Sequence, residues 1–186
     1  MGRVSQAQAE ENRRRVVETA SRLFREHGTQ VSVADLMKAS GLTHGGFYKQ
    51  FVSKEALINE ATAHAFNEFT RIQQDTVEQQ AGKRDAAQRA LIDNYLSVEH
   101  RDNPAEGCPV AALAIDMARE PEDREAGRVF TEGVGAFAEQ LATDDQDGIA
   151  RLCTMFGALV LARATEGSPL SEDILTAARR ALTDAG

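Results

Sequence analysis

Cysteine is scarce in this chain, with only two among 186 residues, and tryptophan is absent. Two cysteines are too few for the disulfide framework of a small secreted domain and fit a reducing compartment. The first residues lack the apolar core of a signal peptide, and the longest apolar run, near 156–162, is too short to span a bilayer. These absences predict a cytoplasmic protein without a membrane partner, and its length suffices to bury a core without staples.

Motifs for catalysis and metal binding are missing as well. The four histidines are scattered without a metal-ligand spacing. Neither a Gly-x-Ser-x-Gly elbow nor a phosphate-binding Gly-x-x-x-x-Gly-Lys sequence occurs. We therefore expect no catalytic residue, no metal site and no cofactor, and a small helical enzyme or a purely ligand-binding protein is a remote alternative.

Basic charge is also in short supply, and it is unevenly placed. The net charge is −8. Residues 1–55 hold nine Lys or Arg and six Asp or Glu, a net of +3, whereas the rest holds twelve and twenty-three, a net of −11. A basic end on an acidic chain favours binding a polyanion through that end alone. By itself this is weak evidence, because +3 over 55 residues is an ordinary fluctuation.

Residues 31–54 carry the most informative pattern, which consists of two short helices, a tight turn between them, and the start of a third helix. Ser32 is placed to cap the first helix. Gly41 is expected to end that helix in a left-handed conformation. The apolar residues that fall on one face of this helix are Val33, Leu36 and Met37.

The second short helix is expected from Thr43, its cap, to Phe51, with Phe47 and Phe51 buried. Gly45 and Gly46 weaken it, because each glycine costs about 1 kcal/mol relative to alanine inside a helix. Their advantage is that a partner surface comes very close to the backbone, as the floor of a DNA major groove does.

The sequence GLTHGGFYKQFVSKEAL, residues 41–57, resembles the helix-turn-helix of TetR-family transcriptional repressors. It has the glycine turn, the aromatic pair Phe47 and Tyr48, and the helix start with Lys54 and Leu57. The resemblance covers about the first third of the chain. It implies an all-α fold of about nine helices, with a three-helix DNA-binding domain at 1–54 and a helical effector-binding and dimerisation domain at 55–186.

The resemblance also implies a set of DNA contacts. Base contacts read the sequence, whereas phosphate contacts fix the register on the duplex. The positions that face bases in the family are here His44, Gly45, Gly46 and Lys49. The positions that hold phosphates are here Tyr48 and Lys54, with Thr43, Ser32 and Gln50 as helpers.

Helical periodicity continues through the rest of the chain. A first helix over 8–27 ends at Gly28 and carries three arginines, Arg13 to Arg15, equally consistent with a solvated turn and with phosphate contacts. A long helix from Lys54 to about Gln80 would link the DNA-binding end to the remainder. Further helices are expected over 84–100, from Pro109 onward, and over 122–142, 146–166 and 171–185.

Cys108 precedes Pro109 at one of these helix starts, where a thiol can have a lowered pKa and greater reactivity. This Gly-Cys-Pro start also resembles a TetR subgroup in which some members sense electrophiles or oxidants through a cysteine in this region. A small buried cysteine without chemistry is the more ordinary interpretation, and Cys153 is expected in the core. Because of the Gly-Cys-Pro resemblance, a redox-sensing or electrophile-sensing repressor that acts through modification of Cys108 remains the alternative function.

The helix over 146–166 is apolar nearly all round, which indicates burial on both sides. We predict that a second subunit covers it, in a four-helix homodimer interface made with the last helix. Two recognition helices would then lie about 34–36 Å apart on a palindromic operator. One apolar side has Ile149, Leu152, Phe156, Leu159 and Val160, and the other has Ala150, Gly157, Ala158, Leu161 and Ala162.

A repressor of this kind responds to a small-molecule effector, whose identity the sequence does not give. Binding is expected to shift the long helix, change the spacing of the recognition helices and release DNA, which requires tighter binding to the DNA-free state. The pocket is expected to be mostly apolar. The residues predicted to line it are Phe66, Phe69, Tyr95, Cys108, Met117, Phe130, Phe137 and Phe156.

Overall fold

The computed structural model describes residues 6–80, 83–119, 124–144 and 146–183. These residues form nine α-helices and two short 3-10 helices, and no strand occurs among them. The all-α prediction is therefore confirmed. The expected starts and ends at Glu122 and Ala185 lie outside the described residues. In the described ranges, no helix combines the length and the apolar character needed to cross a lipid bilayer.

The DNA-binding end predicted from the sequence consists of α1 (Gln6–His27), α2 (Val33–Ala39) and the 3-10 helix η1 (His44–Lys49). It is followed by the long helix α3 (Lys54–Gln79). The remaining elements are α4 (Arg84–Tyr95), α5 (Val98–Asp102), η2 (Pro104–Glu106), α6 (Pro109–Met117), α7 (Glu125–Leu141), α8 (Gly148–Ala164) and α9 (Pro169–Thr183).

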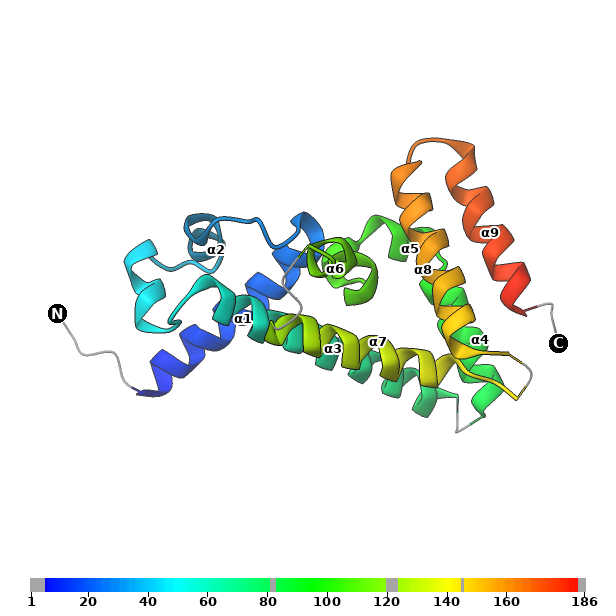
Figure 1. Cartoon of the computed structure of the whole chain (residues 1–186), viewed down its shortest axis with the longest axis horizontal. Coiled ribbons are helices and arrows are strands. Elements are labelled where there is room, and N and C mark those ends of the chain that lie inside the picture. Colours follow the sequence, from blue (N-terminus) through cyan, green and yellow to red (C-terminus); the bar gives the residue numbers. More distant parts are fainter. Residues whose placement is uncertain (1–5, 81–82, 120–123, 145, 184–186) are drawn as a thin grey trace.

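The elements form an elongated molecule (Figure 1). The first three helical elements lie at one end, and the α8–α9 hairpin lies at the other. Helices α3 and α7 pack side by side along the length between these ends. The long helix α3 thus connects the DNA-binding end to the rest of the molecule without a break, as its sequence predicts.

Two hydrophobic clusters fill the interior, and α3 contributes to both. The first joins α1, α2, η1 and the start of α3, where Phe24, Phe47 and Leu57 are buried. The second joins α3, α4 and α6 to α9, where Phe66 and Phe137 are buried. Helix α3 therefore packs in both clusters. A rigid-body movement of α3 that changes the second cluster also changes the first cluster.

The first cluster also contains residues from the second half of the chain. Leu113 and Met117 of α6 and Ala126 of α7 are buried in it. The predicted division at residues 54 and 55 therefore describes the sequence pattern, while the packing joins α6 to the helix-turn-helix end.

The expected helix over 84–100 is wrong, because the structure has two helices, α4 and α5, in its place. Ser97 begins α5 by accepting a hydrogen bond from the backbone N–H of His100 at 3.0 Å, while its hydroxyl donates to the carbonyl of Asn94 at 2.7 Å. A serine that bonds to the backbone on both sides competes with a continuous helix, which explains the break.

Helix α7 crosses α3 closely at Gly133. A Cβ atom at this position would overlap the ring of Phe66. Close contact between α3 and α7 therefore accounts for the glycine at position 133. Gly127 and Gly135 have no atom within 4 Å of where a Cβ would lie, so no such contact explains them.

The outward face of α8 differs from the sequence expectation. Leu152, Met155 and Leu159 face the core, but Ile149 is 64% exposed and Leu161 is 55% exposed. The assignment of Ile149 and Val160 to the same side as Leu152 is therefore wrong, since Val160 is also exposed. Cys153 is exposed too and is not a core residue of the single chain.

Candidate functional site

The turn between α2 and η1 has the geometry that its residues predict. Ser32 caps α2, because its hydroxyl oxygen accepts from the backbone N–H of Asp35 at 3.1 Å. Gly41 follows the helix with φ +70°, and its N–H donates to the carbonyl of Lys38 at 3.0 Å. The next N–H, from Leu42, donates to the carbonyl of Met37 at 2.9 Å. These bonds satisfy the last carbonyls of α2 and fix the angle at which η1 leaves it.

Two stacked aromatic rings pack on the buried side of helix η1. Phe47 is fully buried and Phe51 is 3% exposed, with ring centroids 5.4 Å apart. Tyr48 packs edge-on against Phe47 at 5.1 Å, yet 69% of its surface is exposed. The sequence predicts an α-helix as far as Phe51, whereas the structure has a 3-10 helix that ends at Lys49.

The outer side of η1 presents polar groups over a backbone that is open to approach. His44, Tyr48 and Lys49 are exposed. Gly45 has no atom within 4 Å of where its Cβ would lie, and Gly46 faces only the tip of Met37 and the hydroxyl of Thr43. A donor-rich, glycine-backed surface of this kind fits into a groove of duplex DNA.

The residues predicted to assist phosphate binding differ in how accessible their side chains are. Thr43 is exposed at the start of η1, and its side chain makes no capping hydrogen bond, so its hydroxyl is available to a phosphate. Lys54 is the first residue of α3, where Ser53 caps the helix by accepting from Ala56 N–H at 3.1 Å. Gln50 differs, because its side-chain oxygen is buried without a hydrogen-bond partner among the described residues and so is turned away from the outer face.

Arg13 is a positioning residue that sequence reasoning missed. Its guanidinium donates to the backbone carbonyl of Gln50 and forms an ion pair with Glu60 of α3. It also lies over the ring of Phe51, with its Cζ 4.3 Å from the ring centroid. Arg13 therefore ties α1 to the end of η1 and to α3. Sequence periodicity gives no signal for it, because the contact to Gln50 joins residues 37 positions apart.

The two neighbouring arginines have local partners instead. Arg14 pairs with Glu11 at 2.7 Å and lies 3.7 Å from Glu18, and these bonds raise the pKa of its exposed guanidinium. Arg15 donates to Asn12 at 3.0 Å. These contacts match the interpretation of a solvated basic turn, and both side chains stay exposed beside the helix-turn-helix.

The residues predicted to line the effector pocket lie mainly in the packed core. Most of them belong to the second hydrophobic cluster or pack against it, as expected of ordinary core residues. Met117 lies in the other cluster, which contains the helix-turn-helix. Phe69 and Tyr95 line a small cavity of about 30 Å³.

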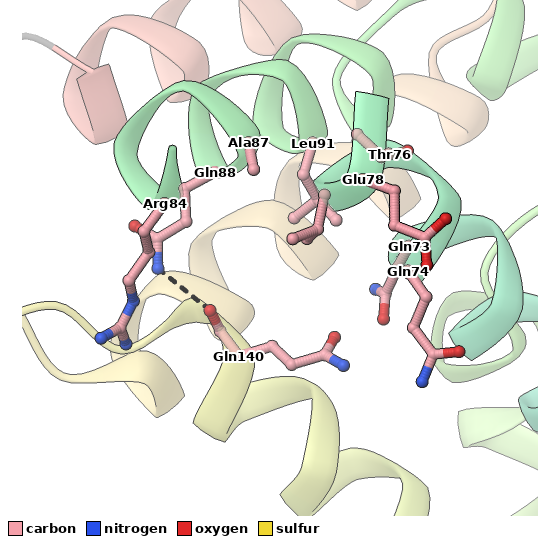
Figure 2. Close-up of a pocket in the computed structure, with 10 residues that line it drawn as sticks. Gln73, Gln74, Thr76, Glu78, Arg84, Ala87, Gln88, Leu91 and Gln140 are labelled. Atoms are coloured by element: carbon pink, nitrogen blue, oxygen red, sulfur yellow. Dashed lines mark hydrogen bonds between the residues drawn. The ribbon is translucent and has the colours of Figure 1, made fainter. Parts of the chain in front are cut away.

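A much larger cavity, of about 440 Å³, lies beside that small one. It opens between the last turns of α3, the start of α4 and the end of α7 (Figure 2). Its walls carry side chains that sequence reasoning did not assign to a pocket, four of them glutamines. None of the eight predicted pocket residues is among those that line it.

Cys108 occupies the predicted position at the start of α6, and it is fully buried. Burial raises the pKa of its thiol, outweighing the nearby backbone N–H groups that lower it. The hydroxyl of Tyr95 lies against this thiol, and burial likewise raises the pKa of Tyr95 far above its ordinary value. The position at a helix start therefore does not produce the lowered thiol pKa that the sequence suggested.

His100 is fixed in its neutral form beside Cys108. Its Nδ1 lies 2.7 Å from the carbonyl of Tyr95, to which it donates, and its Nε2 accepts from the N–H of Cys108 at 3.2 Å. Burial is the main cause that lowers the pKa of His100. In the part of the chain that the structure describes, no group of three or more His, Cys, Asp or Glu residues is placed to hold a metal ion.

Known proteins share both the helix-turn-helix and the whole fold. Residues 16–61 match the family model of bacterial regulatory proteins, tetR family. A TetR transcriptional regulator from Chloroflexus aurantiacus superposes with a TM-score of 0.77 over 96% of each chain, at 24% identity. No curated protein sequence matches this chain significantly.

Two further solved structures cover nearly the whole chain. A TetR-family regulator from Cytophaga hutchinsonii has a TM-score of 0.76 over 97% of each chain, at 18% identity. Escherichia coli NemR in its reduced form has a TM-score of 0.74, covering 94% of this chain and 96% of its own, at 17% identity. Residues 16–61 thus carry the helix-turn-helix of the tetR family of bacterial regulatory proteins, and the chain as a whole has the fold of solved TetR-family regulators.

Proposed function

We propose that this regulator is a cytoplasmic repressor that binds a palindromic operator as a homodimer and leaves it when a small molecule binds. The observation that carries the DNA-binding part is the outer side of η1. There Tyr48 and Lys49 stand exposed above a fully buried Phe47. A rigid aromatic base fixes the positions of these side chains before DNA arrives, which lowers the entropy lost on binding.

We assign base contacts to the exposed η1 surface and phosphate contacts to its edges. Lys49 would donate to guanine O6 or N7, and His44 would meet a base edge. Tyr48, Lys54 and Thr43 would hold phosphates and set the register. The buried side-chain oxygen of Gln50 argues for a smaller role of that residue than the sequence suggested.

The dimer interface in this proposal is the outer face of α8 and α9. The exposed apolar residues Ile149 and Leu161 of α8 and Leu170 of α9 lie 64%, 55% and 52% exposed. A second copy that covers this face would remove them from water, at about 25 cal/mol per Å² of apolar surface. It would also bury Cys153, which would then be protected by the partner subunit.

Coupling between effector and DNA is supported by two elements that touch both ends. Helix α3 runs unbroken from Lys54, beside η1, to Gln79, beside the large cavity. Helix α6 inserts Leu113 and Met117 into the helix-turn-helix core. A ligand that prefers another arrangement of these helices weakens DNA binding tenfold for about every 1.4 kcal/mol of that preference.

The test is binding of the purified protein to DNA from its own upstream region, across a salt titration. Tight binding to a palindromic fragment, with an affinity that falls steeply as salt rises, supports the proposal. Sedimentation should show a dimer, and Leu161→Glu should give monomers that bind DNA poorly. Ile115→Glu, at an apolar residue of α6 that is 62% exposed, is the matched control and should stay dimeric.

The redox alternative has one structural observation in its favour. Cys108 follows Gly107, whose carbonyl accepts a hydrogen bond from Arg25 of α1 at 3.2 Å. An adduct on Cys108 would therefore displace a contact to the DNA-binding end. Its burial and raised pKa work against this route, since the thiolate is the reactive form.

A further inference from the structure

We propose that the cavity between α3, α4 and α7 is the effector site and that it takes an uncharged, amphipathic molecule with a carbonyl group, such as an amide, ester or lactone. This inference rests on the proposed function, because it names the ligand class of a ligand-released regulator. It is drawn from the cavity's size, its amide-rich wall, one unpaired buried donor, and the placement of charge around it.

The cavity has the size and wall of a small-molecule site. Its volume of about 440 Å³ falls within the roughly 300–1,000 Å³ of typical ligand pockets. Val77, Ala87 and Leu91 supply apolar surface. The polar groups are mostly uncharged amides, among them Gln73 and Gln140, whose side chains reach toward the open space in Figure 2.

Gln73 indicates most directly which chemical group the ligand carries. Only 6% of its surface is exposed, and its buried Nε2 has no hydrogen-bond partner among the described residues. A buried N–H donor without an acceptor is costly, so such groups in folded proteins usually have a partner. Because the group lies on the cavity wall, an oxygen acceptor on a bound molecule satisfies it.

Two other polar side chains of this wall bond to the protein itself. Gln88 donates through Nε2 to the carbonyls of Gln140 at 3.0 Å and Ala142 at 3.1 Å. Arg84 donates to the carbonyl of Ala142 at 2.9 Å. These bonds cap the end of α7 and hold the α4 wall in place. Among the described residues that line the cavity, Gln73 is the one with a buried, unpartnered polar atom, and a ligand would complete its bonding.

Charge around the cavity favours a neutral ligand. The charged residues that line it are Glu78 and Arg84, which have opposite signs, and both are exposed. Neither is placed inside, where a ligand charge would have to be paired to offset its loss of water. An anion would also meet the net charge of −11 on residues 56–186. A cation would find only the exposed carboxylate of Glu78, and the Gln73 donor would stay unpaired.

Shared wall residues connect the large cavity to the small one, which lies closer to the start of α6. Gln73, Thr76 and Leu91 line both the large cavity and the small one that reaches Tyr95 and His100. A molecule that bonds to Gln73 therefore lies against the wall that supports Cys108 and the start of α6. This placement connects occupancy of the site to α6, which packs into the helix-turn-helix core.

The experiment compares three probes of equal chain length, heptanamide, heptanoate and heptylammonium, by calorimetric titration of the DNA-free protein. Heptanamide should bind at least about tenfold more tightly than the two ions, since they bring an unpaired charge into the cavity. Gln73→Met, which keeps the volume and removes the amide, should weaken heptanamide about tenfold, as expected for one lost hydrogen bond. Gln79→Met, on the same helix but exposed and outside the cavity, should leave the affinity unchanged.

Three results would overturn the inference: preference for either ion, equal heptanamide affinity in the wild type and Gln73→Met, or no binding of any probe. Operator binding is measured on the same samples without probe. If operator binding is intact and the amide preference is missing, the ligand class is wrong while the regulator stands. If the amide binds through Gln73 but no operator binding is found, the regulator proposal fails and the ligand class stands.

Discussion

Arg25 of α1 donates a hydrogen bond to the backbone carbonyl of Gly107, at 3.2 Å, across 82 positions of the sequence. The same guanidinium pairs with Glu68 of α3 at 2.7 Å, and only 1% of the Arg25 side chain is exposed. One buried cation thus joins the DNA-binding end, the long helix and the residue before Cys108. Gly107 itself is tightly packed, since a Cβ there would lie 3.1 Å from both His100 and Arg163.

Replacing Arg25 with methionine should lower the free energy of unfolding by about 1.5–3 kcal/mol, the range for a lost hydrogen bond to a charged group. The carbonyl of Gly107 loses its partner, and Glu68 loses its counterion. Urea unfolding measures the change. Arg22→Met is the control, because Arg22 pairs with Glu106 at 2.8 Å with its own side chain 61% exposed, and an exposed pair contributes about 1 kcal/mol or less. Equal losses in the two variants would contradict a connecting role for Arg25.

Two glycines of α7 should respond to alanine in opposite directions. Gly133→Ala should destabilise the protein by about 1–3 kcal/mol, because the added methyl overlaps Phe66 in a packed core. Gly135→Ala should stabilise it by about 0.5–1 kcal/mol, because that position is exposed and helical and has no atom near the new methyl. Thermal unfolding of both variants checks the pair. A stabilised Gly133→Ala would mean that α3 and α7 are not in close contact there.

Local features of this fold were predictable from sequence because they depend on neighbouring residues. Ser32, Gly28 and Gly41 act at helix ends as their chemistry requires, and Phe47 lies on the buried side that periodicity indicates. The resemblance to the TetR helix-turn-helix is confirmed, because residues 16–61 match the family model of bacterial regulatory proteins, tetR family.

Contacts between distant segments were not predictable, and they include most of what positions the site. Arg13 and Arg25 look like ordinary helix-surface arginines in the sequence, yet their partners lie 37 and 82 positions away. The cavity of about 440 Å³ gave no signal in the sequence for a similar reason. Aromatic residues such as Phe66 and Phe137 fill the core, whereas the open space lies where three helices diverge beside glutamines such as Gln73.

Acid should destabilise the protein through His100. Burial lowers the pKa of this imidazole in the folded state, so the unfolded chain takes up its proton at a higher pH. The contribution of His100 to stability is complete above the ordinary histidine pKa of about 6.5 and is lost as pH falls from there through the folded-state pKa. Protonation of Nε2 also breaks the hydrogen bond from the N–H of Cys108.

Urea unfolding from pH 8 to pH 5 measures this effect. His100→Gln should reduce the loss of stability over that interval, although the variant starts less stable. His27→Gln is the control, because His27 is exposed, and it should follow the wild type. Parallel curves for the wild type and both variants would show that His100 is not the group responsible.

The thiol of Cys108 should react slowly in the folded protein. Its burial and raised pKa keep it protonated and out of reach of a reagent. In Cys153→Ser, which leaves Cys108 as the remaining cysteine, an aromatic disulfide reagent should modify the native protein slowly and the urea-unfolded protein quickly. Fast modification of the native variant, accompanied by loss of operator binding, would favour the redox-sensing alternative over reversible effector binding.

Operator binding by variants of η1 is the most direct measurement of the proposed function. Lys49→Ala should cost about 1–3 kcal/mol on the cognate operator and reduce its preference over a scrambled site, because it removes a base contact. Lys54→Ala and Tyr48→Phe should weaken binding to both sequences alike, because phosphate contacts carry no sequence information. Lys83→Ala, at an exposed lysine just before α4, is the charge-matched control and should bind as the wild type does. If Lys49→Ala and Lys83→Ala bind the operator equally well, η1 is not the recognition element and the proposed interface is wrong.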